Sequence, residues 1–455
     1  MAGIESKHPQ YTRERQDEWQ LMRDAQDGES AIKAQAEIHL PMPSSYRAMQ
    51  DGGRAAYAAY IDRANFPEIL APAVSGMVGV AHAKEIAIEL PDALNFLWEN
   101  ADGQGMPLEE LHRQITRELL IVGRYGLLAE APQDGGDPYL AGYAAETIIN
   151  WDTGLFVLDE SGFIRDGYQW VERKQYRALI LEDGRYRQEV HAGKGAVAAV
   201  VEPSISGGAA LGFIPFSVAS AIDQKPDIRT PPLIGVARAA KAAYQLDADY
   251  RHQLYWSGQE TLVVINGEAP SAIGAGAVIA LQGAEGVTPD VKYVSPSCSG
   301  IDAHKEAIEA KRQDAVAAGA KLLEQQERAQ ESGEARKLRF QADTATLQSI
   351  VRSSCGLLEK GLRFIAQMKG LSPDVVTVPV PETLLDATMS PADAQALMQV
   401  WLEGGISYPT FYAAMQKGGL ASPERDDAQE YRLIEQDRAR REGLEDDEEE
   451  PGATP

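Results

Sequence analysis

The residue types that most often do chemistry are present but scattered along the chain. The seven histidines are His8, His39, His82, His112, His191, His252 and His304. No two of them have the spacing at which one helix face presents a pair of metal ligands. A Gly-x-Ser-x-Gly nucleophile elbow is also absent from the sequence. These patterns predict neither a metal centre nor a hydrolase, although a fold can still bring distant residues together.

Two glycine-containing stretches resemble nucleotide-binding loops only in part. Gly274-Ala275-Gly276 precedes a predicted strand, whereas a dinucleotide loop joins a strand to a helix and has a third glycine. Gly193-Lys194 lacks the upstream glycine and the downstream Ser or Thr of a phosphate loop. We therefore expect no cofactor, no small-molecule substrate and no enzymatic activity. The two cysteines, Cys298 and Cys355, are expected to be separate reduced thiols.

The charge balance limits the kinds of partner that the chain can hold tightly. Its 455 residues include 43 basic and 68 acidic side chains, giving a net charge of −25. Tight, non-specific DNA binding needs a basic face, so the composition argues against it. An acidic surface repels phosphate and would suit a protein that DNA slides past. The alternative interpretation is that the acidic residues only aid solubility. Met1–Gln20 is polar and no run is long enough to span a membrane, so we expect synthesis and retention in a cytoplasm.

The first half of the chain combines helical patterns with short strands. Helices are predicted over Ala71–Val80 and Met106–Val122, and short β-type runs continue from there to about residue 220. Glu182-Asp183-Gly184 has the composition of a hairpin turn between two such runs. This pattern predicts a mixed α+β fold.

The second half is dominated by long helices. Pro231-Pro232 precedes a helix over Leu233–Trp256, and a β-rich insertion follows over 258–299. Within the insertion we expect strands over Thr261–Ile265, Ala277–Leu281 and Lys292–Val294 and a turn at Asn266-Gly267. After it we expect a helix over Ile301–Gln330, an exposed polar loop over Gln325–Lys337 and a helix over Phe340–Met368. The last expected elements are a strand over Val375–Val380 and helices over 391–403 and 407–417.

Two long helices joined through a compact insertion should lie roughly antiparallel. Neither has the broad apolar stripe of a core helix, and the second is charged around much of its circumference. Ala315–Ala320 is made of small residues with one Val, so another helix could approach closely there. Such a helix either faces water on several sides or packs against copies of itself. A solvated helical hairpin is the alternative interpretation.

Several short motifs, in order, resemble the portal family of tailed bacteriophages, in a branch first catalogued as a phage domain of unknown function. The motifs are His8-Pro9-Gln10-Tyr11, Tyr57-Ala58-Ala59-Tyr60, Gly76-Met77-Val78-Gly79, the run Leu119–Leu128 with Gly123-Arg124-Tyr125-Gly126 at its centre, Pro232-Leu233-Ile234-Gly235, Gly319-Ala320-Lys321-Leu322-Leu323 and Glu403-Gly404-Gly405-Ile406-Ser407. Each motif is short, so their order along residues 8 to 440 carries the resemblance.

The resemblance implies an α+β portal-type fold with an α/β wing, a two-helix stem, a small β-containing clip, a long wing helix and a small helical crown. The implied segments are a wing over 1–230, stem helices over 231–257 and 300–325, a clip over 258–299, a tunnel loop over 326–338, a wing helix and strand over 339–380, a crown over 381–440 and a disordered acidic tail over 441–455.

The resemblance also implies a function and partners. A portal is a ring, usually of twelve subunits, at one capsid vertex of the virion, and double-stranded DNA passes through its channel during packaging and ejection. Its partners are the terminase large subunit, capsid and scaffold proteins, and tail adaptor proteins, with only weak DNA contact and no membrane. Assembly would take place in the host cytoplasm. The predicted channel lining is Lys305, Arg312, Lys321, Gln325, Gln326, Glu327, Arg328, Gln330 and Glu331, and the predicted clip docking residues are Glu260, Asn266 and Glu268.

Two alternatives remain open from the sequence. One is another phage assembly or adhesion protein with an exposed helical arm, which would not form a ring with a central hole. The other is an enzyme whose site no motif reveals, which would need a pocket of converging polar groups.

Overall fold

The computed structural model describes most of the chain. The described residues are 3–84, 86–132, 135–193, 197–205, 208–258, 260–270, 273, 286–294, 300–320, 333–381, 391–402, 405–417, 421 and 425–434. The chain divides into two compact units, Met1–Gln326 with Phe340–Val380, and Glu327–Arg339 with Pro381–Pro455.

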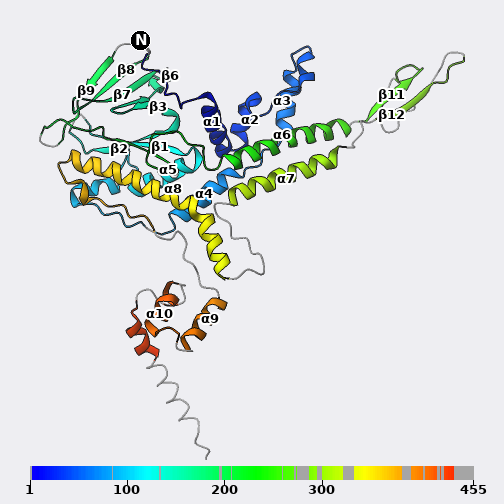
Figure 1. The fold of residues 1–455 in the computed structure, drawn as a ribbon. Coiled ribbons are helices and arrows are strands. Elements are labelled where there is room, and N and C mark those ends of the chain that lie inside the picture. Colours follow the sequence, from blue (N-terminus) through cyan, green and yellow to red (C-terminus); the bar gives the residue numbers. More distant parts are fainter. Residues whose placement is uncertain are drawn as a thin grey trace, which may run out of the picture. The chain divides into compact units, whose positions relative to one another are not determined.

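The larger unit contains most of the regular structure (Figure 1). Its helices are α1 Arg13–Asp27, α2 Glu29–Ala34, α3 Arg54–Arg63, α4 Leu70–Ala81, α5 Leu108–Ile121, α6 Ile234–Ser257, α7 Ile301–Ala320 and most of α8 Gly333–Met368. Its strands are β1 Arg124–Glu130, β2 Tyr139–Ala144, β3 Ile148–Asp152, β4 Leu155–Asp159, β5 Gly162–Asp166, β6 Gln169–Arg173, β7 Gln175–Glu182, β8 Arg185–Ala192, β9 Val197–Val201, β10 Phe216–Ser220, β11 Thr261–Ile265 and β12 Asp290–Val294. Helices combined with small antiparallel sheets make an α+β fold, as predicted.

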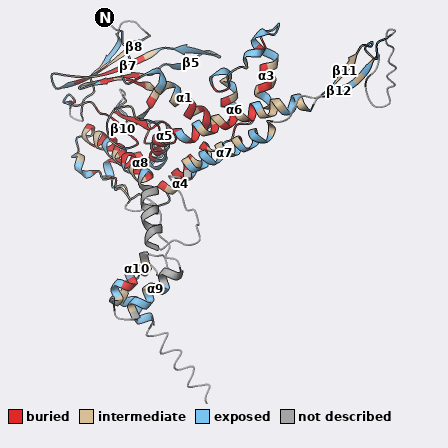
Figure 2. Ribbon diagram, turned by 45° about the vertical axis from the view of Figure 1, so that its right-hand side comes forward, coloured by how far each residue is buried: buried red, intermediate tan, exposed pale blue. Residues whose placement is uncertain are grey.

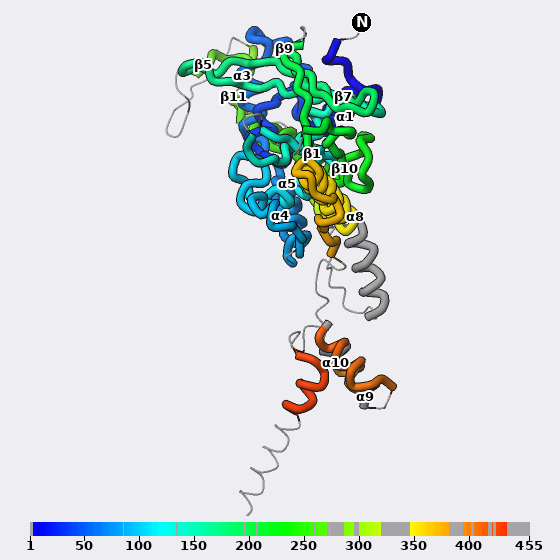
Figure 3. Tube along the Cα trace, turned by 90° about the vertical axis from the view of Figure 1, so that its left-hand side faces the viewer, coloured from blue at the N-terminus to red at the C-terminus, as the bar shows by residue number. Residues whose placement is uncertain are grey.

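A three-stranded sheet in the order β10-β1-β2 forms the centre of this unit. On one face, Gly361 of α8 lies against the side chains of Leu127 and Leu140. On the other face, the Phe216 ring packs edge-on against Phe156 of β4, with centroids 4.9 Å apart. Helices therefore cover one side of the sheet and the strands of a second sheet cover the other. Figure 3 shows α5 and α8 together below β1 and β10.

The second sheet has five strands in the order β3-β4-β7-β8-β9. The predicted turn joins β7 to β8, with Glu182 paired with Arg185. Asp183 and Gly184 both have positive φ angles, 50° and 72°, as a two-residue hairpin loop requires. The hairpin prediction is confirmed.

α6 follows its predicted bounds closely, but one expectation about it is wrong. Its first two-thirds carries a continuous buried face, and the buried residues are Ile234, Val236, Ala237, Ala240, Ala243, Tyr244, Asp247 and Ala248. Four of these are alanines, which score weakly as apolar residues in a sequence pattern but still pack closely against neighbouring helices. α6 is therefore a core helix over most of its length (Figure 2).

Two further expectations differ from the structure. The polar loop expected over Gln325–Lys337 is helical from Gly333 onward, where α8 begins. Glu334, Ala335, Arg336 and Lys337 are all strong helix formers, so Gly333 marks the start of a helix and not a break. Val375–Val380 forms no strand: Pro373–Val375 is a short 3-10 helix, and Thr377 makes only an isolated bridge with Glu89.

The smaller unit contains α9 Pro391–Leu402 and α10 Tyr408–Lys417, where two helices were predicted. Trp401 stacks on Phe411 with ring centroids 4.8 Å apart, and Tyr408 meets Tyr431 at 5.4 Å. These aromatic rings give the unit a small core of its own. The predicted acidic tail, 441–455, lies outside the described residues. Among the described helices, none combines the length and apolar character that crossing a membrane would require.

Candidate functional site: a helical arm with a β-hairpin tip

The helix–insertion–helix segment forms an arm made of α6, β11, β12 and α7 (Figure 1). A methyl group on Gly235, near the start of α6, would lie 3.6 Å from Cβ of Ala318, near the end of α7. At the other end, a methyl group on Gly300 would lie 3.5 Å from the amide nitrogen of Gln253. The two helices therefore run antiparallel and side by side, as the sequence predicted.

A narrow seam of α7 faces α6. The buried or half-buried positions of α7 fall on one side of the helix, and they are Ile301, His304, Ala307, Ile308, Lys311, Ala315, Ala318 and Gly319. This pattern is the seam of a two-helix coiled coil and is narrower than the apolar face of a core helix. Most of the remaining surface of α7 is open to solvent in the single chain.

The small residues at the end of α7 allow three helices to approach one another. A methyl group on Gly319 would lie 3.6 Å from Val236 of α6 and 4.0 Å from Ala73 of α4. The alanine-rich stretch predicted this close approach. It joins the base of the arm to the body of the larger unit.

Polar contacts also fix α6 in the body. The Asp247 carboxylate is buried and accepts hydrogen bonds from the Asn65 backbone at 2.7 Å and from Arg251 Nε at 2.7 Å. Lys241 donates to the carbonyl of Ile38 at 3.0 Å, and Gln245 donates to that of His39 at 2.8 Å. These bonds connect successive turns of α6 to the N-terminal segment.

An aromatic cluster steadies the outer half of α6 against α3. Tyr60 donates to Asp249 at 2.5 Å, and Trp256 Nε1 donates to His252 Nε2 at 2.9 Å. His252 Nε2 is then an acceptor, which leaves Nδ1 to donate to the Tyr46 hydroxyl at 3.2 Å. Burial and the nearby Arg63 lower the pKa of His252, consistent with a neutral ring. Tyr57 and Tyr60 were identified from the sequence only as part of a motif, and the packing of His252 against Tyr60 was not predicted.

Two of the predicted channel residues lie on described parts of α7. Lys305 and Arg312 are both exposed and are seven residues apart, so they share one face about 10 Å apart along the helix. Lys305 has one carboxylate near it, Asp302 at 3.9 Å. The other predicted lining residues, Lys321, Gln325, Gln326, Glu327, Arg328, Gln330 and Glu331, lie outside the described residues.

The tip of the arm is a two-stranded antiparallel ribbon of β11 and β12, with Leu262 opposite Tyr293 and Val264 opposite Val291. These four residues share one face, and Tyr293 keeps 54% of its surface exposed. The predicted docking residues Glu260, Asn266 and Glu268 are all exposed. Glu260 precedes β11 and the other two follow it, so the structure places them at opposite ends of a strand. The strand expected over Ala277–Leu281 lies outside the described residues.

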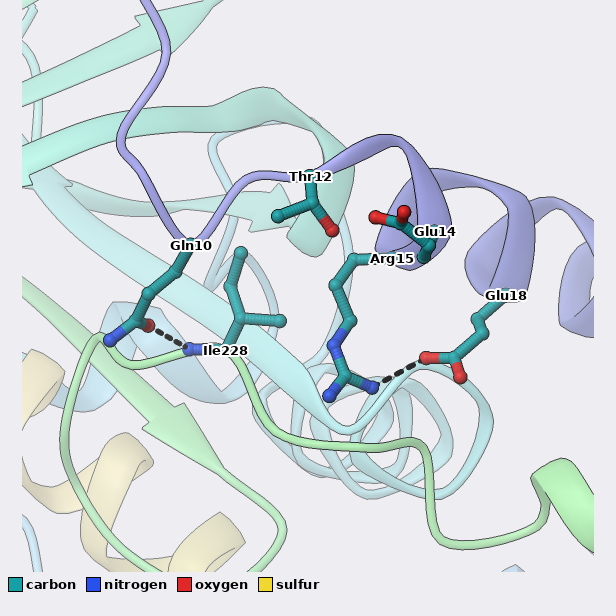
Figure 4. Close-up of a pocket in the computed structure, with 6 residues that line it drawn as sticks. All are labelled: Gln10, Thr12, Glu14, Arg15, Glu18 and Ile228. Carbon is teal, nitrogen blue, oxygen red and sulfur yellow. Dashed lines mark hydrogen bonds and ion pairs between the residues drawn. The ribbon is translucent and has the colours of Figure 1, made fainter.

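A cavity of about 430 Å³ between α1 and the segment before α6 offers little chemistry (Figure 4). Arg15 is paired with Glu18 at 2.6 Å, and Gln10 accepts from the Ile228 backbone at 3.0 Å. Arg15, Glu18 and Gln10 are already bonded to protein, so we interpret this cavity as a gap between packed segments. Over the described residues, no group of three or more His, Cys, Asp or Glu could hold a metal ion.

One buried polar residue, Arg124, has a clear structural role. Arg124 is fully buried, lies 4.1 Å above the Trp151 ring and donates to the carbonyl of Ile148 at 3.0 Å. His8 stacks on Trp151 at 3.9 Å. Burial lowers the pKa of Arg124 to about 9 and raises that of the Cys355 thiol to about 12. Arg124 thus joins the two sheets.

Comparisons with known proteins give one family match and several distant structural similarities. A family model described as a domain of unknown function (DUF4055) matches residues 232–368, from the start of the arm to the end of α8. No curated protein matches the sequence.

The similar solved structures come from gene transfer agent particles. A chain from the virion of a native particle has 16% identity and a TM-score of 0.38, covering 76% of this chain and 88% of that one. A chain from the neck of a native particle, computed with C12 symmetry, has 16% identity and a TM-score of 0.36, covering 76% and 88%. A chain from the neck of an empty particle, computed with C6 symmetry, has 15% identity and a TM-score of 0.35, covering 83% and 93%. At these values the similarity establishes neither a common fold nor a common function.

Proposed function

We propose that this chain is a structural protein of a tailed-phage type of virion and, more specifically, its portal subunit. In this role about twelve copies form a ring at one capsid vertex, and double-stranded DNA moves through the ring during packaging and ejection. The chain itself catalyses no reaction. The terminase, capsid and scaffold proteins, and tail adaptors are the partners that such a ring would bind.

The observation that carries the proposal is the arm. Its outer helix α7 has a narrow seam against α6 and leaves the opposite side exposed, with four acidic and three basic side chains between Ile301 and Ala320. A helix of this kind is suited to packing against equivalent helices of neighbouring copies, where mixed charges can alternate. The motif order in the sequence supports the same assignment.

The segments of the chain take their roles from this proposal. The strands and helices before α6, together with α8, are the wing, and α6 and α7 are the stem. The β11–β12 ribbon belongs to the clip, with Glu260, Asn266 and Glu268 available for docking. The smaller unit with α9 and α10 is the crown.

The charge of the chain favours passage of DNA over capture. A net charge of −25 per chain repels phosphate, while Lys305 and Arg312 would add two basic rings if they face the channel. Weak contacts at a few levels would guide the duplex without holding it. The proposed role would place the protein in the virion and, during assembly, in the host cytoplasm.

The test is the mass and shape of the purified full chain. Twelve chains of 49.4 kDa would give an assembly of about 590 kDa with a central hole in negative-stain images. A monomer or a trimer without a hole at all protein concentrations would refute the portal assignment and favour an adhesion or assembly factor with an exposed arm. A reconstruction with Lys305 and Arg312 facing away from the axis would refute the predicted lining while leaving the ring intact.

A further inference from the structure

A two-stranded ribbon with exposed apolar side chains extends from the five-stranded sheet without covering any of it. β5 and β6 pair with each other, with Ile164 opposite Val171 and Arg165 opposite Trp170, as a continuation of the hairpin between β4 and β7. All ten residues of the two strands are exposed. Figure 2 shows β5 in the colour of exposed residues beyond the edge of the sheet. Two strands alone bury few of their side chains, so a partner surface would add to the stability of this ribbon.

The ribbon presents large side chains on both faces. Phe163 and Trp170 lie diagonally on one face, with 70% and 68% of their surfaces exposed, and Tyr168 at the turn is 98% exposed. A whole aromatic side chain buries about 150–250 Å². Scaled by the exposed fractions of these three residues, complete burial would remove roughly 350–600 Å² from water. A standard interface buries about 800 Å² per partner. The ribbon alone thus suits one part of a larger interface.

The same chain has a second unpartnered surface of matching length. β9 is an edge strand of the five-stranded sheet and has the sequence Val-Ala-Ala-Val-Val. Val197 and Val200 are 42% and 55% exposed. The opposite edge strand, β3, is largely buried. An exposed apolar edge strand offers unpaired backbone groups to another strand, and proteins usually protect such edges.

One chain cannot bring its own two surfaces together. β5 and β9 lie apart in Figure 3, and both strands are exposed. The contact must therefore be made between copies. Charge favours it: Arg173 and Lys174, at the base of the ribbon, are exposed and basic, and Glu202, directly after β9, is exposed and acidic.

We propose that the β5–β6 ribbon of each copy adds to the β9 edge of the next copy around the ring. The contact joins two different surfaces, so repeating it generates a closed ring when the rotation between copies allows closure. Main-chain bonds along β9 would give the affinity, and the aromatic face would give the specificity. This inference rests on the proposed ring and assigns one of its contacts to the wing.

The experiment uses three variants of the full chain. Phe163→Ser with Trp170→Ser removes the aromatic face, Val200→Lys blocks the edge strand, and Ile38→Ser changes a residue of 60% exposure outside both surfaces as a control. All sites are exposed, so melting temperatures should match that of the unmodified chain. Assembly is followed against protein concentration by mass photometry, and amide exchange of 197–201 is compared between assembled and unassembled chains.

We expect the concentration at half assembly to rise on the order of 30-fold for either interface variant, the usual effect of losing a hot-spot residue. The control should not change it. Combining both changes in one chain should weaken assembly little further, because both remove the same contact. Amides of 197–201 should exchange more slowly in the assembled form.

The failures are distinguishable. If the unmodified chain never assembles, both the ring and this contact are refuted. If it assembles and the interface variants assemble like the control, the ring stands and this contact is refuted. Fully additive effects of the two variants, or unchanged exchange of 197–201 on assembly, would show that the ribbon and β9 do not meet.

Discussion

Two histidines between α4 and α5, the buried His112 and the half-buried His82, should make the protein sensitive to mild acid. The rings of His82 and His112 lie 4.8 Å apart, and His82 Nε2 is 3.0 Å from the Thr116 hydroxyl. That hydroxyl in turn lies 2.8 Å from Ser354 of α8. Burial lowers the pKa of His112 to about 3 and that of His82 to about 4. Both rings are therefore neutral in the folded protein at pH 5.

The size of the effect follows from the difference in histidine pKa between the folded and unfolded chains. In the unfolded chain each histidine has a pKa near 6.5 and takes up a proton between pH 7 and pH 5. Since the unfolded state binds more protons, stability is full above pH 6.5 and falls as the pH falls toward the folded values. The loss from pH 7 to pH 5 is about 2 kcal/mol for each histidine, or about 4 kcal/mol for the pair.

The assay is urea unfolding of the full chain at pH 7 and pH 5, with amide exchange to locate the loss in α4 and α5. His112→Phe keeps a ring and removes its titration. The difference in unfolding free energy between pH 7 and pH 5 should therefore shrink by about 2 kcal/mol. Ile115→Val, in the same buried helix, is the matched control and should cost about 0.5–1.5 kcal/mol equally at both pH values. If His112→Phe retains the full acid-induced loss, the ring of His112 is protonated in the folded state and the reasoning is wrong.

Three further predictions concern stability and reactivity. Arg177→Met should destabilise the protein by about 3–5 kcal/mol in thermal melting, because Glu130 and Glu160 would be left largely buried without their cation; a loss below about 1 kcal/mol would contradict this. Gly142→Ala should lower the free energy of unfolding by about 1–3 kcal/mol, since the new methyl group would overlap the hydroxyl of buried Tyr125. Gly76→Ala has open space around it and should instead raise the free energy of unfolding by about 0.5–1 kcal/mol in the same measurement. Cys355 should resist alkylation at pH 8 until the protein unfolds, because burial raises its pKa to about 12; rapid labelling of the folded chain, read by mass spectrometry of the peptide, would show that the site opens.

The sequence predicted local structure best where its signals were strong. Pro231-Pro232 marked the start of α6, and Asp183-Gly184 supplied the two positive φ angles of the hairpin between β7 and β8. The antiparallel arm followed from connectivity alone. These features depend on neighbouring residues, and neighbouring residues are what a sequence pattern records.

The errors arose where packing between distant segments determines the local structure. The buried face of α6 is rich in alanine, so its apolar pattern is weak until Phe66 and the N-terminal segment pack on it. Val375–Val380 alternates like a strand but has no second strand to pair with beyond one bridge at Thr377. The exposure of the ribbon and of the β9 edge was not predicted, because exposure is a property of the fold. The channel lining and the docking residues remain predictions.

The unequal burial of α6 gives the arm a mechanical character. Its 24 residues make a rod about 36 Å long, and the first two-thirds is embedded in the body. The remaining third is about 13 Å long, so a tilt of about 5° where it leaves the body would displace its far end by about 1 Å. Conversely, a force applied at the tip would act on Tyr244 and Asp247, which contact Phe66 and Asn65. A partner that binds the tip could thereby strain the body without touching it.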